Sequence, residues 1–206
     1  MDFKIVELED KHICDVVDVH MRAFPGFFTT FLGPGFVKEI HKYYLSDPTE
    51  IGFVAEDNQT GEVLGFIVGP MSPNSCFKKL VKKRWLAFGL ASITAVLKRP
   101  VIIKRLLRGF FYRGDPPQGS KRAYLSGVAV CPKAQKKGLG RALVETWVQE
   151  VAQRDGTGCY LTTDTENNEA INSFYLKLGW KVESTYTTPE GRVMNRYILD
   201  LPQTRE

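Results

Sequence analysis

The chain has 206 residues, enough for one full-sized domain, and its 43% hydrophobic and 25% charged content is that of an ordinary soluble globular protein. The four cysteines form no C-x-x-C pair and lie near no histidine run. This argues against a zinc site or a disulfide framework and favours a reducing, cytoplasmic location. The net charge of +5 is uneven, because residues 63–114 carry eleven Lys and Arg and no Asp or Glu, whereas the rest of the chain sums to −6.

The first half of the chain is expected to hold a strand, two helices and a β-hairpin. The sequence KIVEL predicts a strand at residues 4–8, and Asp10 is expected to cap a helix that ends at the Pro-Gly pair 25–26. A weaker helix is expected over residues 37–45, and a hairpin over residues 52–69. The apolar face of the first helix consists of Ile13, Val16, Val17, His20, Met21 and Phe24. The N-terminal sequence has no basic stretch followed by an apolar one, so we expect no secretory signal.

The second half predicts alternating strands and helices. A strand over residues 123–130 precedes a helix over 138–155, and the β-branched sequence CYLTTDT predicts a strand at 159–165. A helix capped by Asn167 or Asn168 runs to residue 178, and a hairpin around residues 189–191 ends the chain. No period of 20 to 50 residues recurs, which argues against a repeat architecture.

The hexamer QKKGLG at residues 135–140 lies between a predicted strand and a predicted helix. Backbone N–H groups at a helix start lack partners and lie at the positive end of the helix dipole, so this glycine-bearing turn suits an anion. A P-loop is excluded because G-x-x-x-x-G-K-[ST] is absent, and the dinucleotide motif would need glycine where Leu143 stands.

The sequences VAVCPKAQKKGLG and NEAINSFYLKLGW resemble the two signature segments of the GNAT superfamily of acyl-coenzyme A dependent N-acyltransferases. The resemblance covers residues 4–69 loosely and residues 123–199 well. It implies an α/β (α+β) GNAT fold, with a mixed, mostly antiparallel sheet of about seven strands flanked by helices. We expect a single domain over residues 1–206 that carries a helical basic insertion at about 71–120.

The resemblance implies acetyl-CoA as the acyl donor and no metal. The backbone of the 128–130 strand would bond the pantetheine arm, and Asn168 would bond it too or else cap the helix. Main-chain amides of the loop would hold the pyrophosphate, with two lysines adding charge. The residues implied are Val128, Ala129, Val130, Gln135, Lys136, Lys137, Gly138, Leu139, Gly140, Arg141 and Asn168.

Tyr175 corresponds to the tyrosine that protonates the departing thiolate in this superfamily. An amine attacks the thioester carbonyl and sulfur leaves as a thiolate, which benefits from a nearby proton donor. A thiol pKa of about 8.5 and a tyrosine pKa of about 10 would make that transfer nearly matched. The sequence departs from the pattern at Ile171 and Trp180, both apolar replacements that alter packing more than chemistry.

The general base is not fixed by the resemblance, and the candidates are Glu56, Asp164, His20 and His41. His20 falls on an apolar stripe, where a histidine satisfied within the core is the alternative, and the two carboxylates could be solvated turn residues. In GNAT proteins the N-terminal helices and their loop usually form one wall of the acceptor site. Here that loop is FPGFFTTFLGPGF, whose phenylalanines could stack on an acceptor or pack the loop onto the core.

The basic insertion has two predicted amphipathic helices. Its uncharged run at residues 85–97 is shorter than the about 20 residues that span a bilayer. A lid over the domain and a peripheral contact with an anionic membrane through residues 76–113 both fit, whereas nucleic acid is not expected because no binding motif accompanies the charge. The apolar faces comprise Phe77, Leu80, Val81, Trp85 and Phe88, then Ile103, Leu106, Leu107 and Phe110, and the first polar face holds Lys78, Lys79, Lys82 and Lys83.

Two functions follow from these features. The first is transfer of an acetyl group from acetyl-CoA to the primary amine of a small molecule, with an amino sugar of a surface glycan as one candidate acceptor. The second is a membrane- or polyanion-binding module on an idle GNAT scaffold. Gly138, Gly140, Asn168 and Tyr175 together favour the enzyme, and a homodimer is left open.

Overall fold

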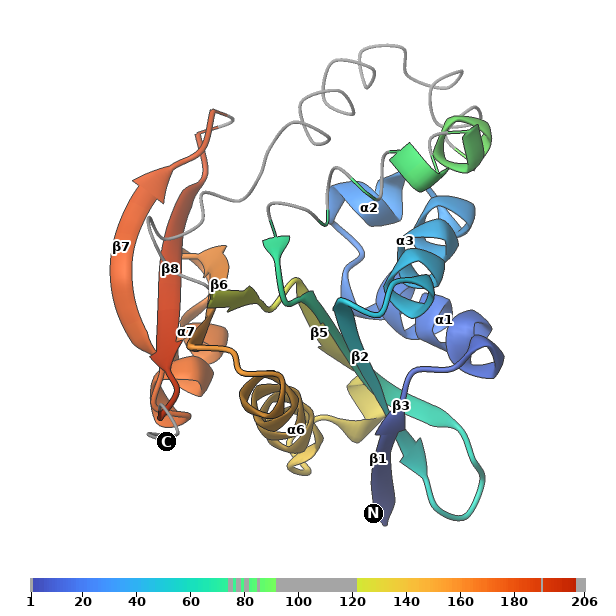
Figure 1. The fold of residues 1–206 in the computed structure, drawn as a ribbon, viewed down its shortest axis with the longest axis horizontal. Coiled ribbons are helices and arrows are strands. Elements are labelled where there is room, and N and C mark those ends of the chain that lie inside the picture. Colours follow the sequence, from blue (N-terminus) through green and yellow to red (C-terminus); the bar gives the residue numbers. More distant parts are fainter. Residues whose placement is uncertain are drawn as a thin grey trace.

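The computed structural model describes residues 2–73, 76, 79, 82–84, 86–91, 122–189 and 191–202. Its strands form two four-stranded sheets, ordered β1-β2-β3-β5 and β4-β6-β8-β7 (Figure 1). Every pairing is antiparallel except that of β4 with β6. The strands are β1 (Phe3–Glu7), β2 (Glu50–Asp57), β3 (Val63–Pro70), β4 (Arg122–Tyr124), β5 (Gly127–Val130), β6 (Gly158–Asp164), β7 (Lys181–Thr187) and β8 (Val193–Asp200).

The helices confirm the predicted order with two corrections. The predicted cap Asp10 lies inside a 3₁₀ turn (Asp10–His12), which Glu9 caps together with His12, so the cap was placed one residue late. The weaker helix begins earlier than expected, with Pro34 in its first turn, where a missing N–H costs nothing. The helices are α1 (Ile13–Ala23), α2 (Phe28–Phe31), α3 (Pro34–Ser46), α6 (Leu139–Gln153) and α7 (Glu169–Lys177), with a second 3₁₀ turn at Pro132–Ala134.

The single strand predicted over residues 123–130 is two strands that belong to different sheets. Leu125 N–H donates to Tyr160 O of β6 at 2.9 Å, whereas the next residue, Ser126, donates to Val68 O of β3 at 3.0 Å. Gly69 lies under this crossing, and an added Cβ would be 2.2 Å from the Tyr124 carbonyl oxygen, so a side chain does not fit there. Beyond the crossing, β5 and β6 diverge (Figure 1).

Two apolar cores fix this arrangement. One packs α6 against both sheets, and its centre includes the fully buried Leu143 and Trp147 together with Tyr197 of β8. The other packs α1 and α3 against β2 and β3. The predicted apolar face of α1 is buried at its start, and His20, Met21 and Phe24 are partly buried.

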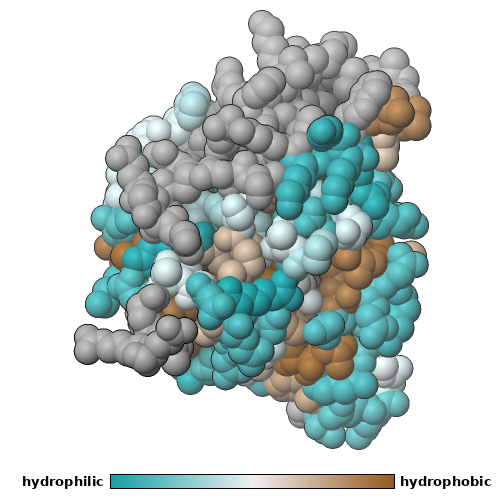
Figure 2. Space-filling view, in the orientation of Figure 1, coloured by the Kyte–Doolittle hydropathy of each residue, from teal (hydrophilic) through white to brown (hydrophobic). Residues whose placement is uncertain are grey.

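From residue 73 onward, the described residues of the basic insertion are helical, and they pack on α3 and its end. The rings of Phe88 and Phe36 lie 4.8 Å apart, in a buried cluster that also holds Cys76. Phe77, Lys78, Leu80, Val81, Trp85 and residues 92–121 lie outside the described residues. No described helix is both long and apolar enough to cross a membrane. Elsewhere, hydrophobic residues reach the surface in separate patches among hydrophilic ones (Figure 2).

Candidate active site

Among the described strands, β5 pairs only with β3, so its edge on the side of β6 has no strand partner. We call the place where β5 and β6 diverge the opening. Cys131 N–H donates to Leu64 O of β3 at 2.8 Å. Because alternate residues of an antiparallel strand face opposite neighbours, the backbone groups of Val128 and Val130 point away from β3 and into the opening. Ala129 directs its backbone toward β3, and its side chain is buried in the second core. Two of the three strand residues predicted to meet pantetheine therefore direct backbone groups away from β3, and of these Val130 O accepts a hydrogen bond from Gln135 Nε2 at 3.3 Å.

The loop after β5 presents a run of free backbone amides. In the described part of the chain, none of the N–H groups from Lys136 to Arg141 donates a hydrogen bond, while Gln135 N–H donates to Pro132 O at 3.4 Å. Lys136 and Gly138 have positive φ angles of 61° and 86°, which turn the chain into α6. The structure thus fits a bound pyrophosphate at six of the seven predicted amides.

The side chains of the loop contribute unequally. Leu139 is fully buried and anchors the start of α6, while the Gly140 Cα lies against Val130 and Phe174, the neighbours that an added Cβ would meet at 3.8 and 3.7 Å. Lys137 Nζ donates to Lys133 O at 3.2 Å. Further along α6, a groove of ≈ 410 Å³ is lined by both cationic and apolar side chains, among them Arg141, Lys177, Leu178 and Trp180.

Tyr175 is 5% exposed and lies among aromatic rings, in the core against which Val128 and Val130 also pack. The rings of Phe174, Trp180 and Tyr197 lie 5.1, 5.7 and 5.9 Å from it. Burial, with a contribution from the Tyr124 hydroxyl, raises the pKa of Tyr175 well above its ordinary value. The hydroxyl therefore stays protonated as a hydrogen-bond donor, and full proton transfer to a thiolate is less closely matched than the sequence suggested.

Asn168 holds the turn between β6 and α7. Its Nδ2 donates to Thr163 Oγ1 at 2.7 Å and to Asp164 O at 3.0 Å. It occupies the N-cap position of α7 without a capping side-chain hydrogen bond, so the predicted capping bond is absent. Both amide hydrogens are engaged, and Oδ1 is the atom left for pantetheine.

The two candidate carboxylate bases are held in ion pairs. Glu56 accepts from Lys4 Nζ at 3.1 Å and from His12 Nε2 at 2.8 Å, and these partners, Lys4 first, lower its pKa against the effect of burial. It also lies two strands away from β5. Asp164 accepts from Arg192 Nε at 3.0 Å and from Nη2 at 2.6 Å. Neither carboxylate has a free oxygen directed at the opening.

The two candidate histidine bases contact each other. His20 Nδ1 lies 3.2 Å from His41 Nε2, and His20 Nε2 lies 3.1 Å from Thr29 Oγ1 of α2. Burial lowers the pKa of His20 to about 4 and, aided by His20, that of His41 to about 3. Both rings are neutral at ordinary pH and can act as hydrogen-bonding groups.

Several residues at the strand crossing were missed by the sequence. The rings of Tyr124 and Tyr160 stack at 4.8 Å. Ser126 Oγ is buried without a partner among the described residues, at the point where the sheets part. The side chains of these residues alternate in the sequence as in any strand, so the sequence carries no signal for them. Only the crossing seen in the structure identifies these residues.

The expected acceptor wall divides its phenylalanines between core and surface. Phe36 is buried with Leu32, whereas Phe27 and Phe31 are exposed. Phe24 lies against Phe27 with ring centroids 4.8 Å apart. Packing onto the core is therefore observed for Phe36, and stacking on an acceptor stays a prediction for Phe27 and Phe31.

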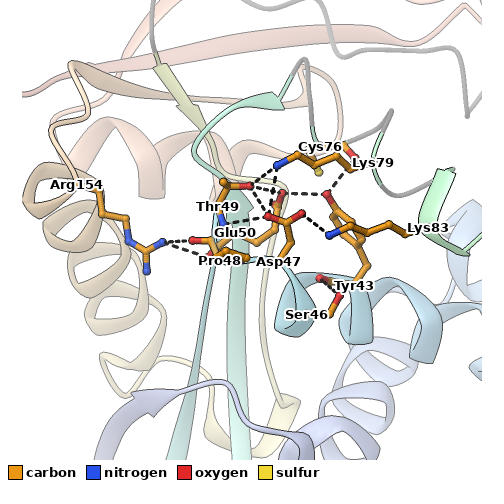
Figure 3. Close-up of polar contacts among 10 residues, drawn as sticks. All are labelled: Tyr43, Ser46, Asp47, Pro48, Thr49, Glu50, Cys76, Lys79, Lys83 and Arg154. Carbon is orange, nitrogen blue, oxygen red and sulfur yellow. Dashed lines mark hydrogen bonds and ion pairs between the residues drawn. The ribbon is translucent and has the colours of Figure 1, made fainter.

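In the described part of the basic helix, Lys79 and Lys83 pair with an acid while their side chains stay 38% and 51% exposed (Figure 3). Lys83 Nζ lies 3.0 Å and Lys79 Nζ 3.5 Å from the buried Asp47 carboxylate. Arg84 Nη1 lies 2.5 Å from Glu39 Oε2. These contacts fix the described part of the insertion to α3.

Glu50 lies beneath the same contacts (Figure 3). Its Oε1 accepts from the Tyr43 hydroxyl at 3.2 Å, while Oε2 is buried with no partner among the described residues. Burial raises the pKa of Glu50 to about 7, against hydrogen bonds from Cys76 and Tyr43 that lower it.

Strands β5 and β6 diverge, and a loop of free backbone amides follows β5 and leads into α6. Together these features define a transferase scaffold for an extended, phosphate-bearing cosubstrate. Residues 15–180 match the Acetyltransferase (GNAT) family. This is most of the chain, which therefore belongs to that family of acyl-coenzyme A dependent N-acetyltransferases. The predicted family and mixed α/β fold are confirmed, as is the family's use of acetyl-CoA.

Relatives of known name agree with this assignment. Over 87 residues, 40% of this chain, the sequence is 31% identical to the GCN5-related N-acetyltransferase 7, chloroplastic, of Arabidopsis thaliana, and the match spans 31% of that protein. The chain thus covers less than a third of this curated relative.

Two solved structures share the fold. The ribosomal-protein-S18-alanine N-acetyltransferase of Escherichia coli matches with a TM-score of 0.61 at 18% identity, over 100% of this chain and 97% of that one. An aminoglycoside 6'-N-acetyltransferase complexed with coenzyme A matches with a TM-score of 0.63 at 17% identity, over 98% and 99%.

Proposed function

We propose that this chain transfers an acetyl group from acetyl-CoA to the primary amine of a small molecule. The observation that carries the proposal is the continuity of three features. The free amides from Lys136 to Arg141 follow β5, the strand of Val128 and Val130. Gly140 in this run lies against Val130 and against Phe174, the residue before Tyr175, whose hydroxyl is protonated. A cosubstrate with a pyrophosphate, an amide-bearing arm and a thioester would use all three.

In the proposed reaction the amine nitrogen attacks the thioester carbonyl carbon. The new C–N bond forms, the C–S bond breaks, and sulfur leaves as a thiolate that accepts a hydrogen bond and finally a proton. Tyr175 is the proposed donor. The nitrogen loses a proton to water or to a side chain of the acceptor wall, since Glu56 and Asp164 are held in ion pairs.

An amino sugar is the acceptor class that we propose first. Support comes from the structural likeness to an aminoglycoside 6'-N-acetyltransferase and from the exposed aromatic rings of Phe27 and Phe31 at the expected wall. A peptide N-terminus is the alternative, because the other structural relative acts on a ribosomal-protein alanine. We also propose a single domain over residues 1–206 and a cytoplasmic location, which the four free cysteines support.

Calorimetry with acetyl-CoA, followed by thiol release, tests the function. We expect saturable binding of acetyl-CoA and thiol release that depends on an amine drawn from amino sugars, polyamines and alanine-terminated peptides. Absence of acetyl-CoA binding would overturn the enzyme and favour an idle scaffold. Turnover restricted to the peptides would overturn the small-molecule acceptor.

Membrane contact through residues 76–113 is a second candidate function, which two exposed side chains favour. Leu86 and Leu90 are 60% and 69% exposed, one helical turn apart, and Lys82 is exposed one turn before Leu86. Apolar and cationic side chains on one helix face suit an anionic lipid surface.

Flotation on phosphatidylserine vesicles tests membrane contact. We expect the wild type to bind these vesicles and a double Leu86→Gln, Leu90→Gln variant to lose binding. Val182→Gln, an exposed change on β7, should retain binding. Equal recovery with neutral vesicles would contradict this candidate.

A further inference from the structure

Three side chains form a hydrogen-bonded chain inside the expected acceptor wall. His41 Nε2 lies 3.2 Å from His20 Nδ1, and His20 Nε2 lies 3.1 Å from Thr29 Oγ1. We call His41, His20 and Thr29 the histidine chain. His20 belongs to α1, Thr29 to α2 and His41 to α3, so one imidazole connects all three helical elements of the wall.

The histidine chain also rests on the sheet next to the opening. The ring of Phe66 in β3 is stacked with His20 at 5.9 Å and an interplanar angle of 2°, and it meets His41 edge-on at 4.8 Å. The same ring lies 4.0 Å from the Cβ position of Gly127, in the strand that borders the opening. One aromatic ring therefore separates the histidine chain from the strand along which an acyl group would lie.

The protonation state of the histidine chain is simple. His20 and His41 are desolvated, and no carboxylate contributes to the pKa of either ring among the described residues. Two neutral rings and one hydroxyl can bond in one of two directions. In both, Nδ1 of His41 is left as a buried atom without a partner in the described part of the chain. No carboxylate among the described residues favours either direction.

We propose that His20 is a positioning residue for the acceptor: through its bonds to His41 and Thr29 it holds α2 and the phenylalanine loop in the place where the acceptor binds. This inference rests on the proposed acetyl transfer. The hydrogen bond between His20 Nε2 and Thr29 positions the loop, because Thr29 lies in the short helix α2. The acetyl-CoA side of the proposed site is built from β5, α6 and α7, and the ring of Phe66 lies between β5 and the histidine chain.

Paired variants separate the two nitrogens of His20. His20→Gln places an amide near the Nε2 position and can still reach Thr29, whereas His20→Asn reaches only the Nδ1 position. Thr29→Val removes the hydroxyl at nearly constant volume. With the best amine of the panel, we expect His20→Asn and Thr29→Val to raise the acceptor KM by about 10-fold with kcat changed by less than about 3-fold, and His20→Gln to restore most of the KM.

The remaining histidine of the sequence, His12, does not belong to the histidine chain and supplies a matched control. His12 is buried, its Nε2 bonds Glu56 at 2.8 Å, and it lies outside the wall. His12→Asn is expected to lower stability and leave the acceptor KM unchanged. The dissociation constant for acetyl-CoA should stay within about 2-fold in every variant, because its site is built elsewhere. An unchanged acceptor KM in His20→Asn, or acetyl-CoA affinity that falls with it, would overturn the inference.

A second measurement does not depend on turnover. Limited chymotrypsin digestion reports the loop directly, because Phe24, Phe27, Phe28 and Phe31 are potential cleavage sites. We expect faster cleavage at these sites in His20→Asn and Thr29→Val than in the wild type. His20→Gln and His12→Asn should be cleaved at the wild-type rate. If the wild type turns over no amine, the proposed function fails, but the digestion still tests whether the histidine chain positions the wall. Equal cleavage rates in the wild type and all variants would overturn the inference.

Discussion

Tyr175 shows how packing changes the chemistry of a residue that a motif identifies. The hydroxyl sits among three aromatic rings, and burial raises its pKa, so it remains a neutral donor at any ordinary assay pH. A donor of this kind stabilises charge on sulfur mainly by a hydrogen bond. Its contribution should appear in kcat and not in cosubstrate affinity.

Replacement of Tyr175 by Phe removes that hydroxyl and keeps the ring contacts. We expect kcat to fall by about 10²-fold, with the acetyl-CoA dissociation constant unchanged. Thiol release measured from pH 6 to pH 10 checks this. Tyr197→Phe is the matched control, because it deletes the same atom from a neighbouring ring whose hydroxyl bonds Asn172 Oδ1 at 2.9 Å. Undiminished turnover of Tyr175→Phe at every pH would remove the assigned role.

At the scale of the element, the start of α6 depends on one glycine. Gly138 is the N-cap residue with φ of 86°, and an added Cβ would meet nothing within 4 Å. The constraint is therefore conformational and not steric. A side chain there favours a different turn, which would redirect the free amides that follow it.

We expect Gly138→Ala to cost about 1 kcal/mol of unfolding free energy and to weaken acetyl-CoA binding by about 10-fold or more. Urea denaturation and calorimetry measure the two effects. Gly61→Ala provides the comparison, since Gly61 has φ of 71° in the β2–β3 turn, again with nothing within 4 Å of an added Cβ. It should lose similar stability and keep full affinity. A parallel loss of affinity in Gly61→Ala would show that the effect is not local.

The elements also show what a sequence can and cannot predict. The resemblance of two segments to the GNAT signatures implied a shared site for the amide loop, Asn168 and Tyr175, because chemistry that needs several groups leaves a motif. The split of residues 123–130 was invisible, since apolar alternation continues through Ser126 while the hydrogen-bonding partner changes from β6 to β3. The contact between Asp47 and Lys83 was also missed, because the two residues are 36 positions apart in the sequence.

At the scale of the whole molecule, three buried groups couple folding to pH with opposite signs. His20 and His41 have folded pKa values of about 4 and about 3, below the unfolded 6.5, so the unfolded chain binds more protons below pH 6.5 and stability rises with pH. Glu50 has a folded pKa of about 7, above its unfolded 4.5, so its contribution to stability falls as pH rises from 4.5 through 7.

Near pH 5 the two histidines outweigh the one carboxyl group by about a single proton, and this excess shrinks toward pH 6.5. We therefore expect the unfolding free energy to rise by about 1.4 kcal/mol per pH unit near pH 5 and to level off above pH 6.5, where the unfolded histidines and the folded Glu50 lose their remaining protons together. Urea denaturation at constant ionic strength measures the curve. Asp47 and Glu56, whose pKa values are lowered, are ionised in both states over this pH range.

Glu50→Gln isolates the opposing group. With the carboxyl removed, the slope near pH 5 should steepen to about 2.7 kcal/mol per pH unit, and the unfolding free energy should keep rising above pH 6.5 in place of levelling off. Glu62→Gln makes the same charge change at an exposed pair with Lys133 and should leave both slopes as in the wild type. If Glu50→Gln and the wild type trace parallel curves, Glu50 is ionised in the folded protein, and a partner for its buried Oε2 must then be sought.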